Sequence, residues 1–222
     1  MLPGGAYQYQ ADHEGEPVAR RMNAEGFFAA VLKYRVAPYR APIPQWDAQK
    51  AVQVLRRLAS RYGYPAEHIA ILGFSAGGHL AASITYLDIP PYHPDDETAQ
   101  FDPCPNAAIL CYPVVTMGAK THMGSRDNLL GAKAGADAIR TWSIEGHIRT
   151  GASPAFLWHT AEDASVPVDN SLMLASSLAD KAVPFSMHIW PHGRHGMGLA
   201  DEQPDIAKWP ALAAEWLHSL GY

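Results

Sequence analysis

Residues 69–79 read IAILGFSAGGH, and this stretch decides the fold. Its apolar first half is typical of a buried strand, and it ends in a Gly-x-Ser-x-Gly motif centred on Ser75. Helix-forming residues follow at once, so the motif predicts a sharp strand-to-helix turn that lifts the serine hydroxyl out of a sheet. Gly73 and Gly77 suit this turn, because a Cβ at either position would crowd the neighbouring backbone. The alternative is a glycine-rich turn in which Ser75 only caps the helix.

Outward from this motif, apolar runs and helical patterns alternate along the chain. The apolar runs predict short buried strands, and the run at residues 27–34 is continuous enough to be buried on both faces. The strands are expected at 27–34, 69–72, 107–112, 155–160 and 185–190, and the helices at 16–25, 46–62, after Ser75, at 168–181 and at 204–220. This alternation predicts an α/β fold, a mostly parallel sheet with helices on both faces.

The length of 222 residues predicts one domain, residues 1–222. Within it, the segment 113–154 is long and glycine-rich and separates two expected strands. Because a connection of that length inside a domain is usually functional, we expect a short lid-like insertion there.

Composition excludes several classes of partner. The net charge is −5 with no cluster of Lys and Arg, which disfavours nucleic acid. No apolar run approaches the ~20 residues of a membrane span. The first residues lack a signal-peptide pattern, and the two cysteines, Cys104 and Cys111, are expected to be free thiols. We therefore expect a cytoplasmic protein, unless a leader has been lost.

No cofactor is expected. No Cys-x-x-Cys spacing occurs, and no metal is expected; no phosphate-loop or dinucleotide fingerprint occurs either. His159 and His188 lie within expected strands and are interpreted as packed core or strand-edge residues, while His79 faces the helix side of the turn.

A serine nucleophile needs a base, and the base needs an acid to orient it. The acid is expected in the loop 161–167, after the strand at 155–160, because catalytic groups gather where parallel strands end. Asp163 is preferred there to Glu162. Asp169 is less suitable because it lies near the start of the next helix, where capping and the helix dipole explain an acidic residue.

The base is expected in the loop after the strand at 185–190. His195 is preferred to His192, because Gly193 and Gly196 flank it and let the backbone turn it toward Ser75. His192 is the reserve candidate. The chain order of serine, acid and histidine is that of α/β-hydrolases.

An oxyanion requires backbone N–H donors. Ala76 follows the nucleophile at a helix N-terminus and offers one donor. A second is expected from Gly5 or Ala6, in a glycine-containing loop that permits close backbone approach.

Taken together, these stretches resemble the carbohydrate-esterase-like group of α/β-hydrolases, which holds xylan and acetyl esterases and relatives of bacterial feruloyl esterase domains. The resemblance covers nearly the whole chain and implies Ser75, Asp163 and His195 as a catalytic triad that hydrolyses short acyl esters, with acetyl groups on sugars as the expected substrate. Pro3 stands where the lipase branch has the histidine of His-Gly-Gly-Gly, which favours this group over that branch. The matching stretches are 3–7, 13–19, 34–38, 73–80, the Asp163 loop with residues 166–167, and 193–196.

Two other readings stay open. A peptidase or amidase on the same scaffold would use acidic residues to hold a substrate amine, and Glu14 and Glu16 lie near the expected oxyanion loop. A binding protein without activity is the other reading, although an intact serine, acid and histidine disfavour it. The expected partner is a small-molecule or oligosaccharide ester, with neither nucleic acid nor membrane.

In this fold a strand normally precedes the oxyanion loop, and two more strands come earlier. Only Met1 and Leu2 stand before Pro3 here, which is short of the usual ~5 residues. We therefore expect that the first strands are missing relative to the family. The unpaired edge would be marginally stable or would borrow pairing from a second chain, which leaves a homodimer open.

Overall fold

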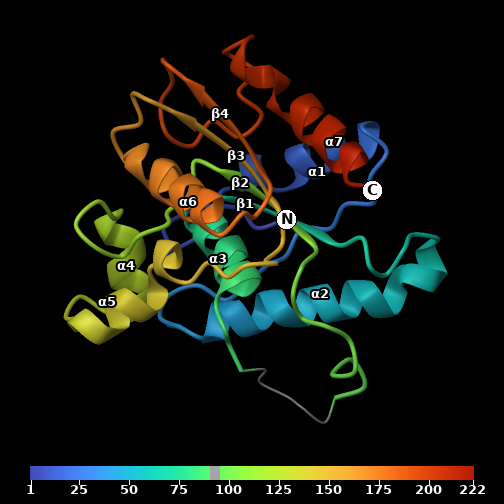
Figure 1. Ribbon diagram of the computed structural model, residues 1–222, viewed down its shortest axis with the longest axis horizontal. Coiled ribbons are helices and arrows are strands. Elements are labelled where there is room, and N and C mark those ends of the chain that lie inside the picture. Colours follow the sequence, from blue (N-terminus) through green and yellow to red (C-terminus); the bar gives the residue numbers. More distant parts are fainter. Residues whose placement is uncertain (91–95) are drawn as a thin grey trace.

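A four-stranded parallel sheet in the order β1-β2-β3-β4 forms the centre of the computed structural model, which describes residues 1–90 and 96–222 (Figure 1). Its strands are β1 (Ala70–Phe74), β2 (Ala107–Cys111), β3 (Ala155–Thr160) and β4 (Phe185–Trp190). Every residue of β2 and β3 is buried, as the continuous apolar runs require for central parallel strands. The expected strands at these four places are confirmed.

The register brings the carboxyl ends of the strands to one edge of the sheet. Phe74 at the end of β1 pairs with Cys111, Cys111 pairs with Trp158, and Thr160 at the end of β3 pairs with Trp190. The start of α3 after β1 and the loops after β3 and β4 therefore lie at the same edge, where ligands bind in open parallel sheets.

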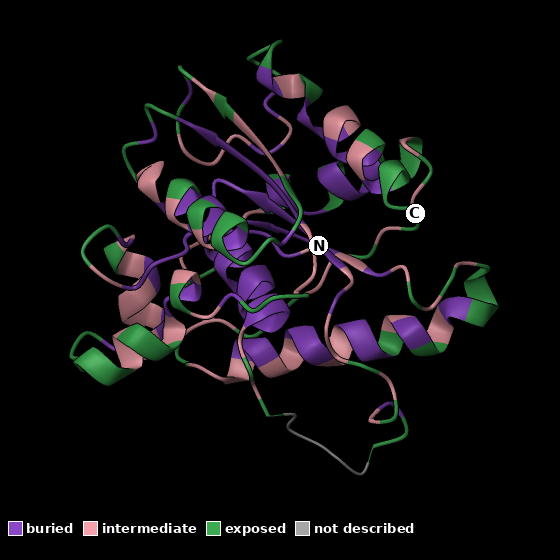
Figure 2. Cartoon of the chain, viewed as in Figure 1, coloured by how far each residue is buried: buried purple, intermediate pink, exposed green. Residues whose placement is uncertain are grey.

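Helices cover both faces of this sheet, as the alternating pattern predicts (Figure 1). The core on one face includes side chains of α1 and α7, and the core on the other face includes side chains of α2, α3 and α6. All residues of α3 are buried, as Figure 2 shows, because it lies between the sheet and α2. The bounds are α1 Glu16–Ala24, α2 Ile43–Tyr62, α3 Ser75–Tyr86, α6 Asp169–Asp180 and α7 Trp209–Ser219.

Two helix starts differ from the expectation. The second helix begins at Ile43 rather than at 46, because Pro44 occupies its first turn, where the missing N–H costs nothing. The last helix begins at Trp209 rather than at 204, and the short 3-10 helix η3 (Ile206–Lys208) precedes it.

The strand expected at 27–34 is wrong. These residues form no regular strand, and most of them are half-buried or exposed. Two backbone hydrogen bonds join them to Met1, from the Leu32 N–H to the Met1 carbonyl and from the Met1 amine to the Ala30 carbonyl. An apolar run becomes a strand only where a ladder partner exists, and two bonds do not make a ladder.

Met1 and Leu2 lie between residues 27–34 and β1. Leu2 N–H donates to the Leu72 carbonyl and Phe74 N–H donates to the Leu2 carbonyl, which gives an isolated parallel bridge between Leu2 and Gly73. Met1 and Leu2 thus lead into the oxyanion loop from beside β1. The expectation that earlier strands are missing relative to the family stays a prediction.

The segment 113–154 folds into short elements, α4 (Met123–Leu130), α5 (Ala136–Trp142) and the 3-10 helix η2 (Ile144–Gly146). Met117, Leu129 and Ile144 anchor it in the core, whereas α5 buries none of its residues. Among helices in the described ranges, none combines the length and the apolarity needed to cross a bilayer.

Candidate active site

Ser75 is the first residue of α3 and follows β1 without a connecting loop. Its φ of 52° lies in the left-handed region, which is the strained backbone expected of the turn. A Cβ at Gly73 would collide with the Gly77 carbonyl, and a Cβ at Gly77 would collide with the carbonyls of Leu2 and Pro3. The two glycines are therefore required by backbone-to-backbone contact, as the motif predicts.

The structure brings Ser75, His195 and Asp163 into one hydrogen-bonded chain. The Nε2 atom of His195 lies 2.8 Å from Ser75 Oγ, and its Nδ1 atom lies 2.6 Å from Asp163 Oδ2. Because a carboxylate only accepts, Nδ1 carries the proton of the neutral imidazole, and Nε2 accepts the serine hydroxyl.

The reserve candidates lie elsewhere. His192 and Glu162 form an exposed pair, with Nδ1 of the histidine 2.8 Å from Oε1 of the carboxylate. Asp169 opens α6 and lies 3.5 Å from the ammonium of Lys120. Neither His192 nor Asp169 takes part in the chain at Ser75.

Hydrogen bonds hold Asp163 ionised despite its burial. Its Oδ1 accepts the N–H groups of Ser165 and Val166, both at 2.9 Å. Burial opposes ionisation, but the hydrogen bonds from His159, His195 and the Val166 N–H outweigh it and hold the pKa of Asp163 well below its ordinary value. The acid beside His195 is thus a carboxylate at neutral pH.

His159 is a contact that the sequence did not reveal. It is fully buried in β3, as expected of a core histidine, but its Nε2 atom also lies 3.4 Å from Asp163 Oδ2. The same Nε2 atom lies 2.9 Å from the Val166 carbonyl, and its Nδ1 atom lies 2.8 Å from Ser171 Oγ. His159 therefore joins β3, the Asp163 loop and α6.

The oxyanion-loop candidates lie against the nucleophile. A Cβ at Gly4 would come within 3.1 Å of Ser75 Cβ, so Gly4 packs directly on the serine. Gly5 and Ala6 follow with φ values of 125° and 57°. Their carbonyls turn away from Ser75 to other partners, the N–H groups of Gln8 and Tyr9 and the amide of Asn128.

The N–H groups of Gly5 and Ala6 donate no hydrogen bond to any group in the described ranges. Ala76 is the second residue of α3, so its N–H lies at the helix N-terminus, which favours negative charge. Ala76 thus follows Ser75 directly, and Gly5 and Ala6 follow Gly4, which packs on the serine.

A contact between Tyr7 and His79 joins the oxyanion loop to α3. Tyr7 is fully buried, and its hydroxyl lies 2.8 Å from His79 Nδ1, while His79 Nε2 lies 2.8 Å from the Trp142 carbonyl. Burial lowers the pKa of His79 to about 4, against the opposing effect of the Trp142 carbonyl. The ring is neutral at pH 7, so Nε2 donates to the carbonyl and Nδ1 accepts the tyrosine hydroxyl.

The segment 113–154 reaches the site through His122, which caps α4. Partial burial and the nearby charge of His195 lower the pKa of His122, and Asp163 opposes this effect. Sequence reasoning did not find His122, because nothing in the motif pattern connects it with Ser75.

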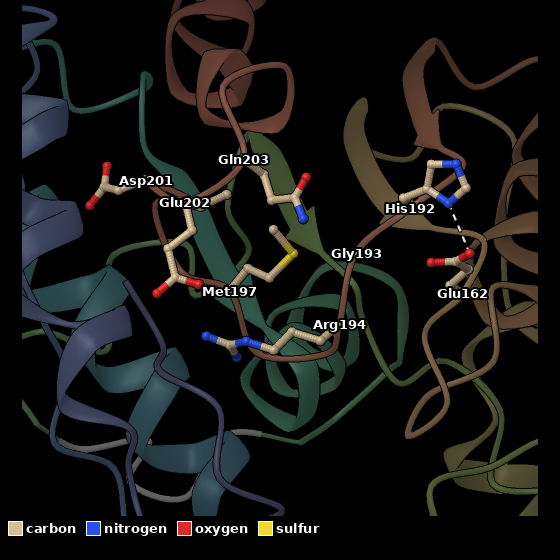
Figure 3. A pocket seen from close by; sticks show the side chains of 9 residues that line it. Glu162, His192, Gly193, Arg194, Met197, Asp201, Glu202 and Gln203 are labelled. Atoms are coloured by element: carbon tan, nitrogen blue, oxygen red, sulfur yellow. Dashed lines mark hydrogen bonds and ion pairs between the residues drawn. The ribbon is translucent and has the colours of Figure 1, made fainter.

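A polar cavity of about 560 Å³ lies beside the loop after β4, and Gly193 and Arg194 of that loop line it (Figure 3). His192 and Glu162 bound one end of it, and Arg194 and Glu202 lie at the other. Ser75, Asp163 and His195 do not line this cavity, so it is separate from the hydrogen-bonded chain.

Comparison with known proteins finds related sequences. The BD-FAE family model matches residues 1–178. Endo-1,4-beta-xylanase B of Butyrivibrio fibrisolvens is 35% identical over 91% of this chain and 33% of its own length. An acetylxylan esterase of Xylanibacter ruminicola is 30% identical over 89% of this chain and 40% of its own length. The chain thus spans about a third to two fifths of these curated relatives.

Solved structures extend the agreement to the fold. An acetyl ester-xyloside bifunctional hydrolase from Caldicellulosiruptor lactoaceticus superposes with a TM-score of 0.94 at 40% identity, over 99% of this chain and 81% of that one. The carboxylesterase Cest-2923 of Lactobacillus plantarum gives a TM-score of 0.85 at 29% identity, over 99% of this chain and 84% of that one. The resemblance stated from the sequence is confirmed. The chain therefore belongs to the BD-FAE family and has the α/β-hydrolase fold.

Proposed function

We propose that this chain is a serine carboxylesterase that removes short acyl groups, acetyl above all, from saccharides, with Ser75, His195 and Asp163 as its triad. One observation carries the proposal. Ser75 Oγ, the two ring nitrogens of His195 and Asp163 Oδ2 form a continuous chain with separations of 2.8 and 2.6 Å. The segments directly after three different strands supply these groups, in the geometry that activates a serine hydroxyl.

In the acylation step, Ser75 Oγ attacks the ester carbonyl and its proton passes to His195 Nε2. Asp163 stabilises the resulting imidazolium through Nδ1 and stays ionised. The imidazolium then protonates the departing sugar oxygen, and the acyl group remains on Ser75. A water molecule then attacks the acyl carbonyl and gives a proton to His195 Nε2. The bond to Ser75 Oγ breaks, Ser75 recovers the proton from His195, and the carboxylic acid is released.

Negative charge on the substrate oxygen rises in each tetrahedral intermediate. The N–H groups of Ala76 and of Gly5 or Ala6 are proposed to hold it, because the two loop amides have no partner among residues 1–90 and 96–222 and Gly4 packs on Ser75. Removal of one such donor costs about 10²–10³ in turnover in enzymes where it has been measured.

The names of relatives support an acetylated saccharide. One relative is an acetylxylan esterase, and one solved neighbour is an acetyl ester-xyloside hydrolase. The helices of the segment 113–154 are 8 and 7 residues long, so it contains no long amphipathic helix of the lipase kind. A small acyl group with a bulky polar leaving group fits this arrangement.

The peptidase reading loses its support at Glu14 and Glu16. Glu14 is buried, with its oxygens bonded to Gly4 N–H and the Tyr112 hydroxyl. Glu16 points to solvent in a pair with Arg20 on α1. Neither carboxylate lies free beside Ser75 to hold a substrate amine.

p-Nitrophenyl acetate tests the proposal and the inactive-binding alternative together. We expect a nitrophenol burst equal to the enzyme concentration, or steady turnover, with acetate cut faster than octanoate. Ser75→Ala should abolish this activity, by about 10⁶ in turnover as in a well-studied serine protease. Ser176→Ala, an exposed serine on α6, is the control and should leave the rate unchanged.

A Ser75→Ala protein that folds and keeps more than a few per cent of the wild-type rate would refute the mechanism. Strong activation at a lipid–water interface, or a preference for octanoate, would refute the substrate class.

A further inference from the structure

Glu14 is a buried carboxylate beneath the oxyanion loop, in the 3-10 helix η1 (Asp12–Glu14). Only 2% of its surface is exposed. Its Oε2 accepts the Gly4 N–H at 2.7 Å and its Oε1 accepts the Tyr112 hydroxyl at 2.6 Å. A buried carboxylate is retained only where such charge-assisted bonds offset its lost hydration, so both contacts are strong.

The first contact controls the oxyanion loop. A Cβ at Gly4 would lie 2.8 Å from Glu14 Oε2 and 3.1 Å from Ser75 Cβ, so Gly4 is held between the carboxylate and the nucleophile. The bond to Gly4 N–H fixes this residue directly before Gly5, whose own N–H is a proposed oxyanion donor. A shift of Glu14 would therefore move that donor.

The second contact reaches the base loop. The Tyr112 hydroxyl, which donates to Glu14, accepts the Gly198 N–H at 2.9 Å. The Tyr112 ring packs edge-on against the His195 ring, with centroids 5.0 Å apart and planes at 67°. Tyr112 thus connects the carboxylate with the loop that carries the base.

The neighbouring residue His13 makes a second link to the same loop. Its Nε2 atom lies 3.0 Å from the Gly196 carbonyl, and a Cβ at Gly198 would come within 3.0 Å of the His13 ring. One short helix therefore contacts both the oxyanion loop and the base loop.

We propose that Glu14 is a positioning residue that keeps the oxyanion donor and His195 in register around Ser75, through Gly4 on one side and Tyr112 on the other. The inference rests on the proposed serine esterase activity. Glu14 itself does not touch the reacting atoms. Its loss should misplace groups that act in the tetrahedral intermediate, and a misplacement of about 1 Å costs on the order of 10² in rate.

Two variants break the contact between Glu14 and Tyr112, one from each end, and leave an acceptor for the Gly4 N–H. Glu14→Gln keeps an acceptor for Gly4 N–H but turns an amide toward a tyrosine hydroxyl that already accepts from Gly198, so the hydroxyl proton loses its partner. Tyr112→Phe keeps the ring on His195 and removes the hydroxyl. Tyr86→Phe is the matched control, because its buried hydroxyl donates to the Ser153 carbonyl from the far end of α3.

The experiment measures kcat/KM for p-nitrophenyl acetate, the inhibition constant of a trifluoromethyl ketone and the melting temperature. The ketone forms a tetrahedral adduct with the serine and so reports the same geometry as the transition state. We expect kcat/KM to fall about ten- to a hundredfold in Glu14→Gln and Tyr112→Phe, and the ketone to bind more weakly by the same factor. Tyr86→Phe should leave both values within twofold, even where it melts as early as Tyr112→Phe.

Three results would overturn the inference. They are rates within twofold of wild type in both variants, a lower kcat/KM with unchanged ketone affinity, and an equal loss in Tyr86→Phe. If Glu14→Gln does not fold, Tyr112→Phe decides by the same criteria. A wild-type protein without esterase activity would refute the proposed function itself and the inference with it, which distinguishes the two failures.

Discussion

β3 and residues 27–34 are both apolar runs, yet only β3 is a strand. β3 lies between β2 and β4 and pairs with both, whereas residues 27–34 meet Met1 through two bonds. Both are connected with the site. β3 runs into the loop of Asp163, and the Tyr34 hydroxyl donates a hydrogen bond to the carbonyl of Pro3, next to the oxyanion loop, at 2.5 Å. Hydrogen-bonded strands on both sides, rather than apolar character, therefore distinguish a segment that forms a strand from one that does not.

The largest expected effect belongs to His195, in the loop after β4. β4 is the strand that pairs with β3, whereas no strand pairs with residues 27–34 among the described residues. His195→Ala should cost about 10⁶ in turnover, because the nucleophile and base act as a unit. His192→Ala also removes an imidazole, but from an exposed pair with Glu162, and should cost about tenfold or less, since surface pairs contribute little. Steady-state hydrolysis of p-nitrophenyl acetate measures both, and the reverse ranking would move the base to His192.

The second prediction compares the two runs directly through one chemical change. Leu157→Ala in β3 should lower the free energy of unfolding by about 2–5 kcal/mol, because this leucine is fully buried. Leu32→Ala should cost about 1 kcal/mol or less, because Leu32 is only partly buried at the edge of the core. Urea denaturation of both variants checks this, and equal losses would show that residues 27–34 support the fold as firmly as β3 does.

The third prediction concerns how stability depends on pH through His79, which joins α3 to Tyr7 in the oxyanion loop. Burial lowers the pKa of His79 from 6.5 to about 4, so between these values the unfolded chain binds more protons than the folded one. Stability must therefore fall as the pH falls through this window, by about 2 kcal/mol for this group between pH 7 and pH 5.

His79→Gln should flatten that dependence, although it lowers stability at pH 7 through loss of the Tyr7 and Trp142 contacts. His192→Gln is the exposed control and should keep the wild-type slope. Denaturation at several pH values decides the matter, and an unchanged slope in His79→Gln would contradict the assignment of a neutral buried ring.

The smallest expected effect is that of Tyr34→Phe, which removes the contact between residues 27–34 and the oxyanion loop. Loss of one buried hydrogen bond should cost about 1 kcal/mol of stability. We expect a severalfold lower kcat/KM as well, because the Pro3 carbonyl precedes Gly4 in the loop. Tyr86→Phe is the control, because it should lose a similar amount of stability and keep its kcat/KM. A kcat/KM that is unchanged in Tyr34→Phe, or lowered equally in Tyr86→Phe, would contradict a positioning role for Tyr34.

The parts that sequence could predict are those with a local pattern. The strand, the turn at Ser75 and the helix after it follow from one continuous motif, and the loops after β3 and β4 follow from the apolar runs that precede them. Residues 27–34 misled the prediction because a strand depends on partners that the run itself does not encode. The preference for His195 over His192 came from two flanking glycines, and the hydrogen-bonded chain gives it a geometric basis.

Contacts between distant residues could not be predicted in this way. Glu14 and Tyr112 are 98 positions apart and meet through a single hydrogen bond. Glu14 stood out only as an acidic residue near the oxyanion loop, where it suggested a site for a substrate amine. His159 looked like an ordinary core histidine, and only the fold of the following loop brings Asp163 back to its ring.

The collision that any side chain at Gly77 would make with the carbonyls of Leu2 and Pro3 sets a boundary for laboratory evolution. Positions 73 and 77 are closed to every replacement, because backbone atoms that cannot rotate away fill the space. α5 is the opposite case, since none of its residues is buried. A library that keeps the chemistry can therefore vary the exposed positions of α5 and should leave the turn at Ser75 untouched.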